Sequence, residues 1–395
     1  MANISTSAIQ EQKAYTTPIH RIPYDILSVI LLDLCHEDSF TPLRLQAVCR
    51  SWRDILLGTP LAWARIPVTA HLNNPYDLTC TYLERSLNLP LHLRFERLLI
   101  TDSRIIEKLR ESADRVRCLQ GRHWRIAEVI YPPLRFSNLE KLSISGELGH
   151  SRDDNLGAKW DMGMFPKLTS LDISWSDEHL ELFSTSTEFP PLIELVVACH
   201  NTAPLDIILN KCSQSLRSVH VDFRHTPPVV ENGQKALQVF PNLRYLNHGF
   251  NRRPPRKSPW PFTGLAPNLE FYYEEGIVAP PFDISAVTAL GIDEQQDLSK
   301  FSKLKMLYIA GKPSLALDVV RDLNERPWLC PELRQILVRR YTRSLEEAIE
   351  LLDQRAENTG RKVEMDWEVA RNDLLDWSRE TMNVNPHQSC HINYR

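Results

Sequence analysis

The sequence predicts an α/β protein in which a short N-terminal helical segment precedes a curved array of parallel strands. Two observations support this prediction. Residues 19–66 hold three closely spaced helix-start signals, each followed by apolar residues at helical spacing. Between Leu139 and Leu269, a short leucine-containing motif then recurs at intervals of 24 to 29 residues. Such a motif is typical of stacked units that share one continuous core.

The chain of 395 residues divides into four predicted parts: a polar N-terminal tail (1–18), the helical segment (19–66), the strand array (67–380) and a C-terminal tail (381–395). Hydrophobic residues make up 43% and charged residues 24%, as in ordinary folded soluble proteins. The formal net charge of −4 gives no electrostatic basis for binding nucleic acid or an anionic membrane. We therefore expect neither of these partners.

The spacing of the cysteines and the distribution of apolar residues predict the compartment in which the protein resides. The 8 cysteines are scattered and form no C-x-x-C pair, so neither a disulfide framework nor a zinc site is expected. The N-terminal residues lack the basic and apolar regions of a secretory signal. No apolar run of about 18 residues occurs, so no membrane span is expected. These features predict reduced thiols in a cytoplasmic or nuclear protein.

The first predicted helix is unusually apolar. Pro23 and Asp25 both favour the first turn of a helix. The apolar residues that follow at helical spacing are Ile26, Leu27, Ile30, Leu31 and Leu34. Three short helices cannot bury all of these side chains among themselves. We therefore expect Ile26, Leu27, Ile30 or Leu34 to be partly exposed.

Two further helix starts follow the first helix. Thr41-Pro42 and Thr59-Pro60 each place a threonine at the predicted N-cap and a proline at the first helical position. Gly58 is placed to end the second helix. The side chains near one face of that helix are Leu45, Val48, Trp52, Ile55 and Leu56. The helices would either present an apolar face to a partner or form an ordinary three-helix subdomain with an internal core.

The strings IPYDILSVILLDL (22–34), LRLQAVCRSWRDI (43–55) and TPLAW (59–63) resemble the F-box family, most closely that of mushroom-type fungi. Ile22 replaces the usual Leu of that family, and Ala62 stands where Leu is usual before Trp63. The resemblance implies that residues 19–66 bind the Skp-type adaptor of an SCF ubiquitin ligase. The implied docking residues are Ile22, Pro23, Ile26, Leu27, Ile30, Leu34, Leu45, Val48, Cys49 and Trp52.

The recurring motif reads aromatic or small residue, Pro or Ser, x, Leu, x, x, Leu, x, apolar. Its copies are 136–144, 165–173, 189–197, 216–221, 240–246, 267–272, 301–309 and 330–338, with weaker copies at 116–119 and 287–292. Alternation along a strand predicts that each copy adds one short parallel strand to a shared core. The side chains expected to point inward are Leu142, Leu171, Leu195, Val219 and Leu307.

Helical periodicity marks the segments expected to cover the outer face of these strands, namely Ser103–Glu111, Pro204–Cys212 and Leu315–Asn324. The array resembles the leucine-rich repeat family, whose repeats commonly follow an F-box. The Asn or Cys expected after the strand motif is missing from most copies, so an irregular solenoid is predicted. The alternative is an α/β domain with several parallel strands. A helix starting at Ser344, ended by Gly360, and an edge strand over 361–366 would cap the array.

The sequence contains none of the common catalytic motifs that we searched for. The common nucleotide, esterase and zinc-protease motifs do not occur. Cys199-His200 and Cys390-His391 are adjacent pairs, and neighbours on a strand point to opposite faces. We expect no catalytic residue, no cofactor and no metal ligand. A basic, proline-rich stretch carries Arg252, Arg253, Arg256 and Lys257. This stretch is either a solvated loop or a loop that recognises an acidic or phosphorylated partner.

Together these features predict a non-enzymatic substrate-recognition adaptor of an SCF (cullin–RING) ubiquitin ligase, which binds an unknown protein target through its repeats. One alternative is an F-box protein-interaction scaffold without a role in ubiquitination. Another is an enzyme with a pocket in the arc of strands, although the sequence holds no sign of converging titratable residues.

Overall fold

The computed structural model describes residues 18–69, 74–95, 102–122, 134–145, 161–174, 177–223, 238–250, 264–274, 284–339 and 344–367. The chain forms two compact units, Met1–Ile130 and Tyr131–Arg395. Both predicted tails lie outside the described residues, except for Pro18.

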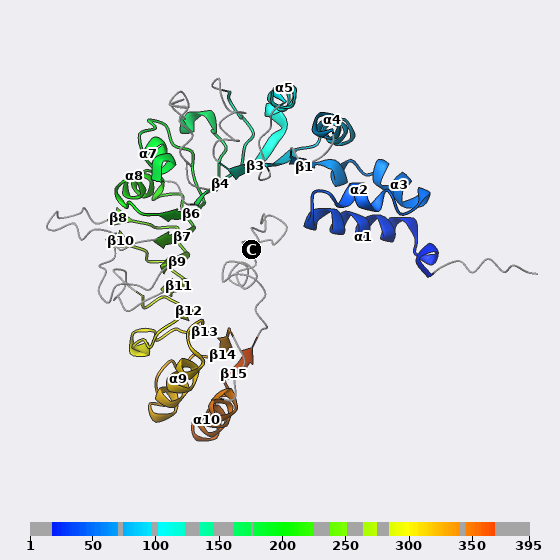
Figure 1. Ribbon diagram of the computed structural model, residues 1–395. Helices are drawn as coiled ribbons and strands as arrows, with labels where there is room; N and C mark the ends of the chain where they lie inside the picture. The colour runs from blue at the N-terminus through cyan, green and yellow to red at the C-terminus, as the bar shows by residue number, and fades with distance from the viewer. Residues whose placement is uncertain are drawn as a thin grey trace, which may run out of the picture. The chain divides into compact units, whose positions relative to one another are not determined.

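The described part of the first unit contains five α-helices and three strands (Figure 1). The helices are α1 (Tyr24–Glu37), α2 (Thr41–Leu45), α3 (Arg50–Leu57), α4 (Pro75–Arg85) and α5 (Ser103–Glu111). The strands are β1 (Arg65–Val68), β2 (Leu91–Phe95) and β3 (Val116–Arg122). Both strand pairs, β1 with β2 and β2 with β3, are parallel. Short 3₁₀ helices cover Pro18–Arg21, Pro60–Trp63 and Ala113–Arg115.

The second predicted helix is broken in the structure. Helix α2 ends at Leu45, and Cys49 has an extended backbone (φ −158°, ψ 171°) before α3 begins. Thr41 is not the N-cap, because the helix already includes it and Phe40 occupies the N-cap position, with no side-chain capping hydrogen bond. Instead, the Asp38 carboxylate accepts a hydrogen bond from the Phe40 amide at 3.0 Å and so holds the turn that precedes α2.

The third predicted helix is a single 3₁₀ turn at Pro60–Trp63. The Thr59 hydroxyl donates back to the Ile55 carbonyl at 2.8 Å, and no side-chain capping hydrogen bond forms at this start. The Thr59 hydroxyl thus bonds a carbonyl in the last turn of α3 and does not cap the 3₁₀ turn that follows. The turn nevertheless buries Trp63 completely.

Trp63 is the centre of the first unit's core. Its indole Nε1 donates to the Leu56 carbonyl at 2.8 Å, and its ring meets Tyr82 of α4 edge-on at 5.1 Å between centroids. The Arg85 guanidinium lies 4.3 Å from the centroid of the same indole. The Tyr82 hydroxyl donates to the Ser39 carbonyl at 2.6 Å. These contacts join α3, the 3₁₀ turn and α4 into one packed body.

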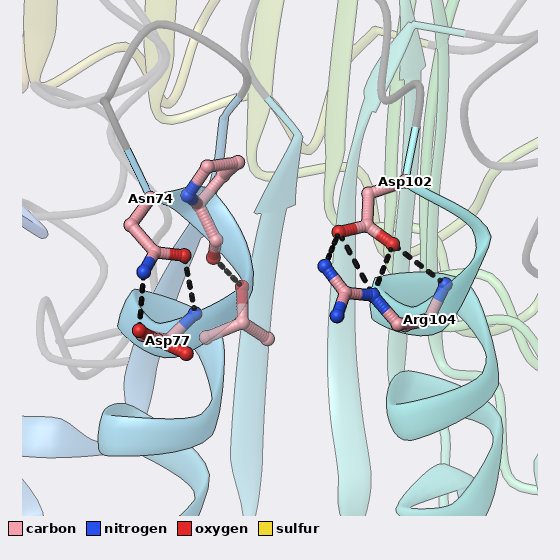
Figure 2. A network of polar contacts seen from close by, with 6 residues as sticks. Asn74, Asp77, Asp102 and Arg104 are labelled. Carbon is pink, nitrogen blue, oxygen red and sulfur yellow. Dashed lines mark hydrogen bonds and ion pairs between the residues drawn. The ribbon is translucent and has the colours of Figure 1, made fainter.

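Helices α4 and α5 pack together and begin in the same way (Figure 2). The Asn74 side chain accepts from the Asp77 amide at 3.3 Å, and Asp102 accepts from the Arg104 amide at 3.0 Å. Each cap satisfies a backbone N–H that has no partner within its helix. The Arg104 guanidinium also donates to Asp102, and this contact lowers the pKa of the Asp102 carboxyl. The predicted helix Ser103–Glu111 is confirmed.

The described part of the second unit combines four α-helices with one long parallel sheet and a separate pair of short strands (Figure 1). The helices are α7 (Asp177–Ser184), α8 (Ala203–Cys212), α9 (Pro313–Glu325) and α10 (Ser344–Thr359). The sheet strands are β4 (Lys141–Ser145), β5 (Ser170–Ser174), β6 (Glu194–Cys199), β7 (Ser218–Phe223), β9 (Tyr245–Phe250), β11 (Phe271–Glu274), β12 (Ala289–Ile292), β13 (Met306–Ile309), β14 (Gln335–Val338) and β15 (Glu364–Trp367). The short pair is β8 (Gln238–Val239) with β10 (Gly264–Leu265), and 3₁₀ turns cover Met162–Met164 and Leu298–Lys300.

The second unit confirms the predicted parallel strands. Equivalent motif residues pair in register across the sheet, in the order Leu142, Leu171, Leu195, Val219, Leu246, Tyr272, Leu290, Leu307, Ile336 and Met365. The five side chains predicted to point inward are all buried. The weak copy at 287–292 supplies β12. The sheet does not close on itself.

The predicted outer helices and C-terminal cap are present. Helices α8 and α9 cover the segments predicted at 204–212 and 315–324. Gly360 ends α10 in the left-handed region (φ 69°), where its amide donates to the Ala356 carbonyl at 2.8 Å. The predicted edge strand is displaced by a few residues to Glu364–Trp367.

One buried histidine follows a row of aliphatic core positions that ends with Val197 and Val221. His248 pairs in register with Val221, and its ring meets Phe223 edge-on at 5.3 Å. Burial, with a smaller contribution from His220, lowers the pKa of His248 to about 3. The imidazole is therefore neutral in the folded protein at neutral pH.

Acid is expected to destabilise the fold through His248. The unfolded chain binds a proton there below about pH 6.5, whereas the folded chain does so only near pH 3, so stability falls as the pH drops between these values. At pH 4.5 the loss would reach up to about 2.7 kcal/mol, at about 1.36 kcal/mol for each pH unit. Urea unfolding at pH 7.5 and 4.5 measures it. His248→Gln should show a smaller acid loss than the wild type, and an equal loss in both would contradict this assignment.

Candidate docking surface

Helix α1 exposes a group of apolar side chains that we call the α1 surface. Its members are Ile26 (50% exposed), Val29 (65%), Ile30 (42%) and Leu34 (37%). Their spacing places all four on one side of the helix. The opposite side, formed by Leu27, Leu31 and Cys35, is buried. An aliphatic patch of this kind on a folded unit is typical of a protein-interaction site.

The segment between α2 and α3 carries the next exposed apolar side chain. Val48 is exposed, and both flanking helices pack against α1. Leu45, Cys49 and Trp52 are half-buried around it. Pro23 is exposed, and Ile22 is half-buried, just before α1. Nine of the ten predicted docking residues thus keep some exposed surface.

Leu27 is the exception among the predicted docking residues. It is only 7% exposed and lies on the buried side of α1. The expectation of exposed residues in this helix is therefore met by Ile26, Ile30 and Leu34, and Leu27 belongs to the core of the unit. Val29 was not predicted to dock, although it follows Ile26 by three residues and is the most exposed member of the surface.

The exposed charges beside the α1 surface are acidic on α1 and basic on α2 and α3. Asp25 and Asp33 are exposed on α1 itself, whereas Arg44, Arg50 and Arg53 are exposed on α2 and α3. Arg44 pairs with Asp38 at 2.9 Å, and Arg53 donates to the Gln46 carbonyl at 3.2 Å. Exposed pairs of this kind contribute little stability. A polar rim around an apolar centre is the usual composition of a protein interface.

The second unit offers a different kind of surface. Residues that alternate with the leucine rows form the other face of the sheet, which we call the alternate face. Over β4 to β6 this face is polar: the Asp172 carboxylate accepts from the Ser143 hydroxyl at 3.0 Å and the Ser174 hydroxyl at 2.9 Å. The Ser170 hydroxyl donates to Glu194 at 2.8 Å on the same face.

Over β9 to β13 the alternate face is aromatic. Tyr245 and Phe271 stack with centroids 4.5 Å apart and planes at 8°. Tyr273 and Tyr308 extend this group, which we call the aromatic cluster. Tyr273 lies over Gly291, where an added Cβ would meet the tyrosine ring at 2.2 Å. The glycine thus leaves room for the ring.

The structure describes one of the two adjacent Cys-His pairs noted in the sequence. Cys199 is buried, and burial, with smaller contributions from Asp177 and Asp222, raises the pKa of its thiol, which keeps the thiol protonated. His200 pairs with Asp177 (Nδ1 to Oδ2 3.2 Å). The predicted loop residues Arg252, Arg253, Arg256 and Lys257 lie outside the described residues, as do Cys390 and His391.

Comparisons with known proteins assign no family. No protein-family model and no curated protein matches the chain. Within the ranges described above, no three His, Cys, Asp or Glu side chains come together in a way that could hold a metal ion. None of the helices in those ranges is both long and apolar enough to cross a membrane.

Proposed function

We propose that this protein is a substrate-recognition adaptor of an SCF (cullin–RING) ubiquitin ligase. The F-box-like segment 19–66 would bind the Skp-type adaptor through the α1 surface and Val48. The irregular leucine-rich solenoid formed by the strand array would hold a protein target. The observation that carries the proposal is the row of exposed aliphatic side chains on α1, in the segment whose sequence resembles the F-box family.

The burial pattern of α1 supports a helix that packs against its own unit on one side and against a partner on the other. Leu27, Leu31 and Cys35 fill the core of the unit, while Ile26 and Ile30 remain in water at a cost of about 25 cal/mol for each Å² of apolar surface. A partner that covers the exposed side recovers this free energy. Aliphatic anchors at helical spacing are what a helix-in-groove interface requires.

The chemistry of ubiquitin transfer would then take place on other subunits. In this proposal the protein contributes proximity, because it holds a target close to the charged conjugating enzyme and so raises the local concentration of the reactants. The absence of a predicted catalytic motif in the sequence agrees with such a role. The alternative is a scaffold that binds the Skp-type adaptor without delivering targets. Loss of target turnover on deletion of residues 19–66 would distinguish a ligase adaptor from such a scaffold.

The double substitution Ile26→Ala with Ile30→Ala is expected to abolish capture of a Skp-type adaptor. Truncated interface anchors typically cost about 2 kcal/mol or more each, so the two losses would weaken binding about a thousandfold. Isothermal titration of the purified full chain with the adaptor measures the change. Folding should be little affected, because both side chains are exposed in the folded unit.

Matched controls separate loss of the interface from loss of hydrophobicity. Ile193 and Ile207 are exposed in the second unit, and replacing both with alanine removes the same number of carbon atoms. This variant should bind the adaptor as the wild type does. Leu27→Ala, by contrast, should lower the stability of the first unit. If the Ile26/Ile30 variant keeps wild-type affinity, the proposed docking mode is wrong.

A further inference from the structure

Strands β1, β2 and β3 of the first unit carry basic residues and no acidic ones. Arg65 lies in β1, Arg94 in β2, and Arg117 and Arg122 in β3, whereas none of the three strands contains Asp or Glu. In the whole chain the acidic residues outnumber the basic ones, at 50 against 46. The three strands therefore concentrate positive charge in one place, and such a concentration attracts anionic partners.

Helices cover one face of these strands. Helices α4 and α5 lie on one side of β1 and β3, and α4 packs against β1 (Figure 1). Ile66, Leu93 and Leu119 pair in register across the three strands, and each is exposed by 1% or less. Side chains that alternate with these core residues point to the opposite face, which we call the arginine face. Arg94 directly follows Leu93 and is exposed, so it lies on the arginine face.

A shift of register exposes a second arginine. Leu91 pairs with Val116, but His92 pairs with Cys118, so Arg117 is an extra residue of β3. Extra residues of this kind bend a strand and redirect a side chain. Val116 is fully buried, whereas Arg117 is exposed and so points away from the core. The arginine face thus presents two exposed arginines on neighbouring strands.

The arginines differ in their contacts within the chain. Arg94 forms no ion pair or side-chain hydrogen bond with any residue of the described ranges. Arg65 is half-buried, and its guanidinium donates to the His36 carbonyl near the end of α1. Arg65 thus joins α1 to β1, whereas Arg94 is ready to bind a partner. Gln120 pairs in register with Arg94 and adds an amide that can donate a hydrogen bond beside it.

We propose that the arginine face binds an extended, anionic segment of a partner protein through Arg94 and Arg117. A guanidinium binds a carboxylate or a phosphate with two parallel hydrogen bonds. The two arginines lie on adjacent strands about two positions apart, so their Cα atoms are roughly 8–10 Å apart. Residues i and i+2 of an extended segment point the same way about 7 Å apart, a separation that long arginine side chains can match. The face therefore suits a segment with Asp, Glu or phosphorylated residues at alternate positions.

A protein segment fits this face better than a nucleic acid does. Proteins that bind single-stranded nucleic acid stack its bases on aromatic side chains. Phe95 is the only Phe, Tyr or Trp in the three strands, and at 5% exposed it belongs to the core. The formal net charge of −4 also gives the whole chain no general attraction for a polyanion.

This inference goes beyond the docking of a Skp-type adaptor and does not depend on it. Where the proposed adaptor role holds, the anionic segment would belong to the protein target. Adaptor binding is measured through the α1 surface, whereas binding at the arginine face is measured with peptides and without the adaptor. Failure of either measurement therefore leaves the other proposal standing.

Fluorescence anisotropy with the full-length chain tests the arginine face. The labelled probes are octaglutamate and a peptide of equal length in which phosphoserine alternates with glycine, and the comparison probes are octalysine and an oligothymidylate. We expect at least one of the anionic peptides to bind, and more weakly as salt is added. The tighter of the two identifies carboxylate or phosphate as the preferred group. A Kd above about 1 mM for both, or tighter binding of either comparison probe, would overturn the proposal.

The double substitution Arg94→Glu with Arg117→Glu should weaken binding of the preferred peptide at least about tenfold, because charge-assisted hydrogen bonds are replaced by repulsion. Arg217→Glu with Arg244→Glu is the matched control, since both are exposed arginines of the second unit and the net charge changes equally. The control should bind as the wild type does. Equal losses in the two variants, or wild-type affinity in the first, would contradict the assignment.

A neutral variant and a crosslink provide independent checks. Should the glutamate variant fail to fold, as judged by circular dichroism, Arg94→Gln with Arg117→Gln takes its place and should show the same loss. The preferred peptide is also made with p-benzoylphenylalanine at one end and crosslinked to the wild-type chain. We expect crosslinks to β2 or β3. Crosslinks confined to the basic stretch 251–263, or to other parts of the second unit, would show that the peptide binds elsewhere.

Discussion

Replacing Trp63 with alanine should destabilise the first unit by about 3–5 kcal/mol, as expected for a large aromatic residue removed from a core. The indole is fully buried, donates to the Leu56 carbonyl at 2.8 Å, and packs against both Tyr82 and Arg85. Its loss leaves a cavity between α3 and α4 and removes the partner of a buried carbonyl. Hydrogen exchange of the amides in α1 and β1 measures the effect on this unit.

Leu61→Ala is the matched control for this substitution. Leu61 belongs to the same 3₁₀ turn but is exposed, so its truncation should cost less than about 1 kcal/mol. Adaptor affinity provides an independent readout, because the α1 surface depends on the packing beneath it. Equal protection of α1 in the Trp63→Ala variant and the wild type would show that the indole does not hold these helices together.

Replacing Leu195 with alanine should lower the free energy of unfolding of the second unit by about 3–5 kcal/mol, within the range for buried leucines. Leu195 pairs in register between Leu171 and Val219, and all three side chains are buried. The neighbouring strands are hydrogen-bonded on both sides and cannot move inward to fill the cavity. Hydrogen exchange in β5, β6 and β7 is the measurement, with urea unfolding as a second probe.

Val196→Ala is the matched control, because it truncates a side chain on the opposite face of the same strand. Val196 is the next residue along β6, points to the alternate face and is only half-buried. Its truncation should cost about 1 kcal/mol or less. A larger loss for Val196 than for Leu195 would mean that the core lies on the other face of the sheet.

The strand array was predictable because its signal is local and repeated. Leucines two and three positions apart fix which side chains point inward, and repetition fixes the register between strands. The weak copy at 287–292 formed a strand in the expected place, since Leu290 keeps the inward position. The aromatic cluster was not predicted, although Tyr245, Phe271 and Tyr273 stand at alternating positions beside the motif residues of β9 and β11.

The helical segment was less predictable because its limits depend on tertiary contacts. Helical periodicity continues through residues 45–50, so nothing in the pattern shows the break at Cys49. The sequence also did not determine which side of α1 is exposed. This helix is apolar on nearly every side, so periodicity alone could not decide whether Leu27 or Val29 faces the neighbouring helices.

Hydrogen exchange of the full-length chain with and without a purified Skp-type adaptor is the most direct test of the proposed docking. We expect slower exchange in α1 (Tyr24–Glu37) and in residues 46–52 when the adaptor is present, with no such change in the Ile26→Ala/Ile30→Ala variant. Slower exchange confined to the strands of the second unit, or no binding of the adaptor at all, would contradict the claim that α1 is the docking helix.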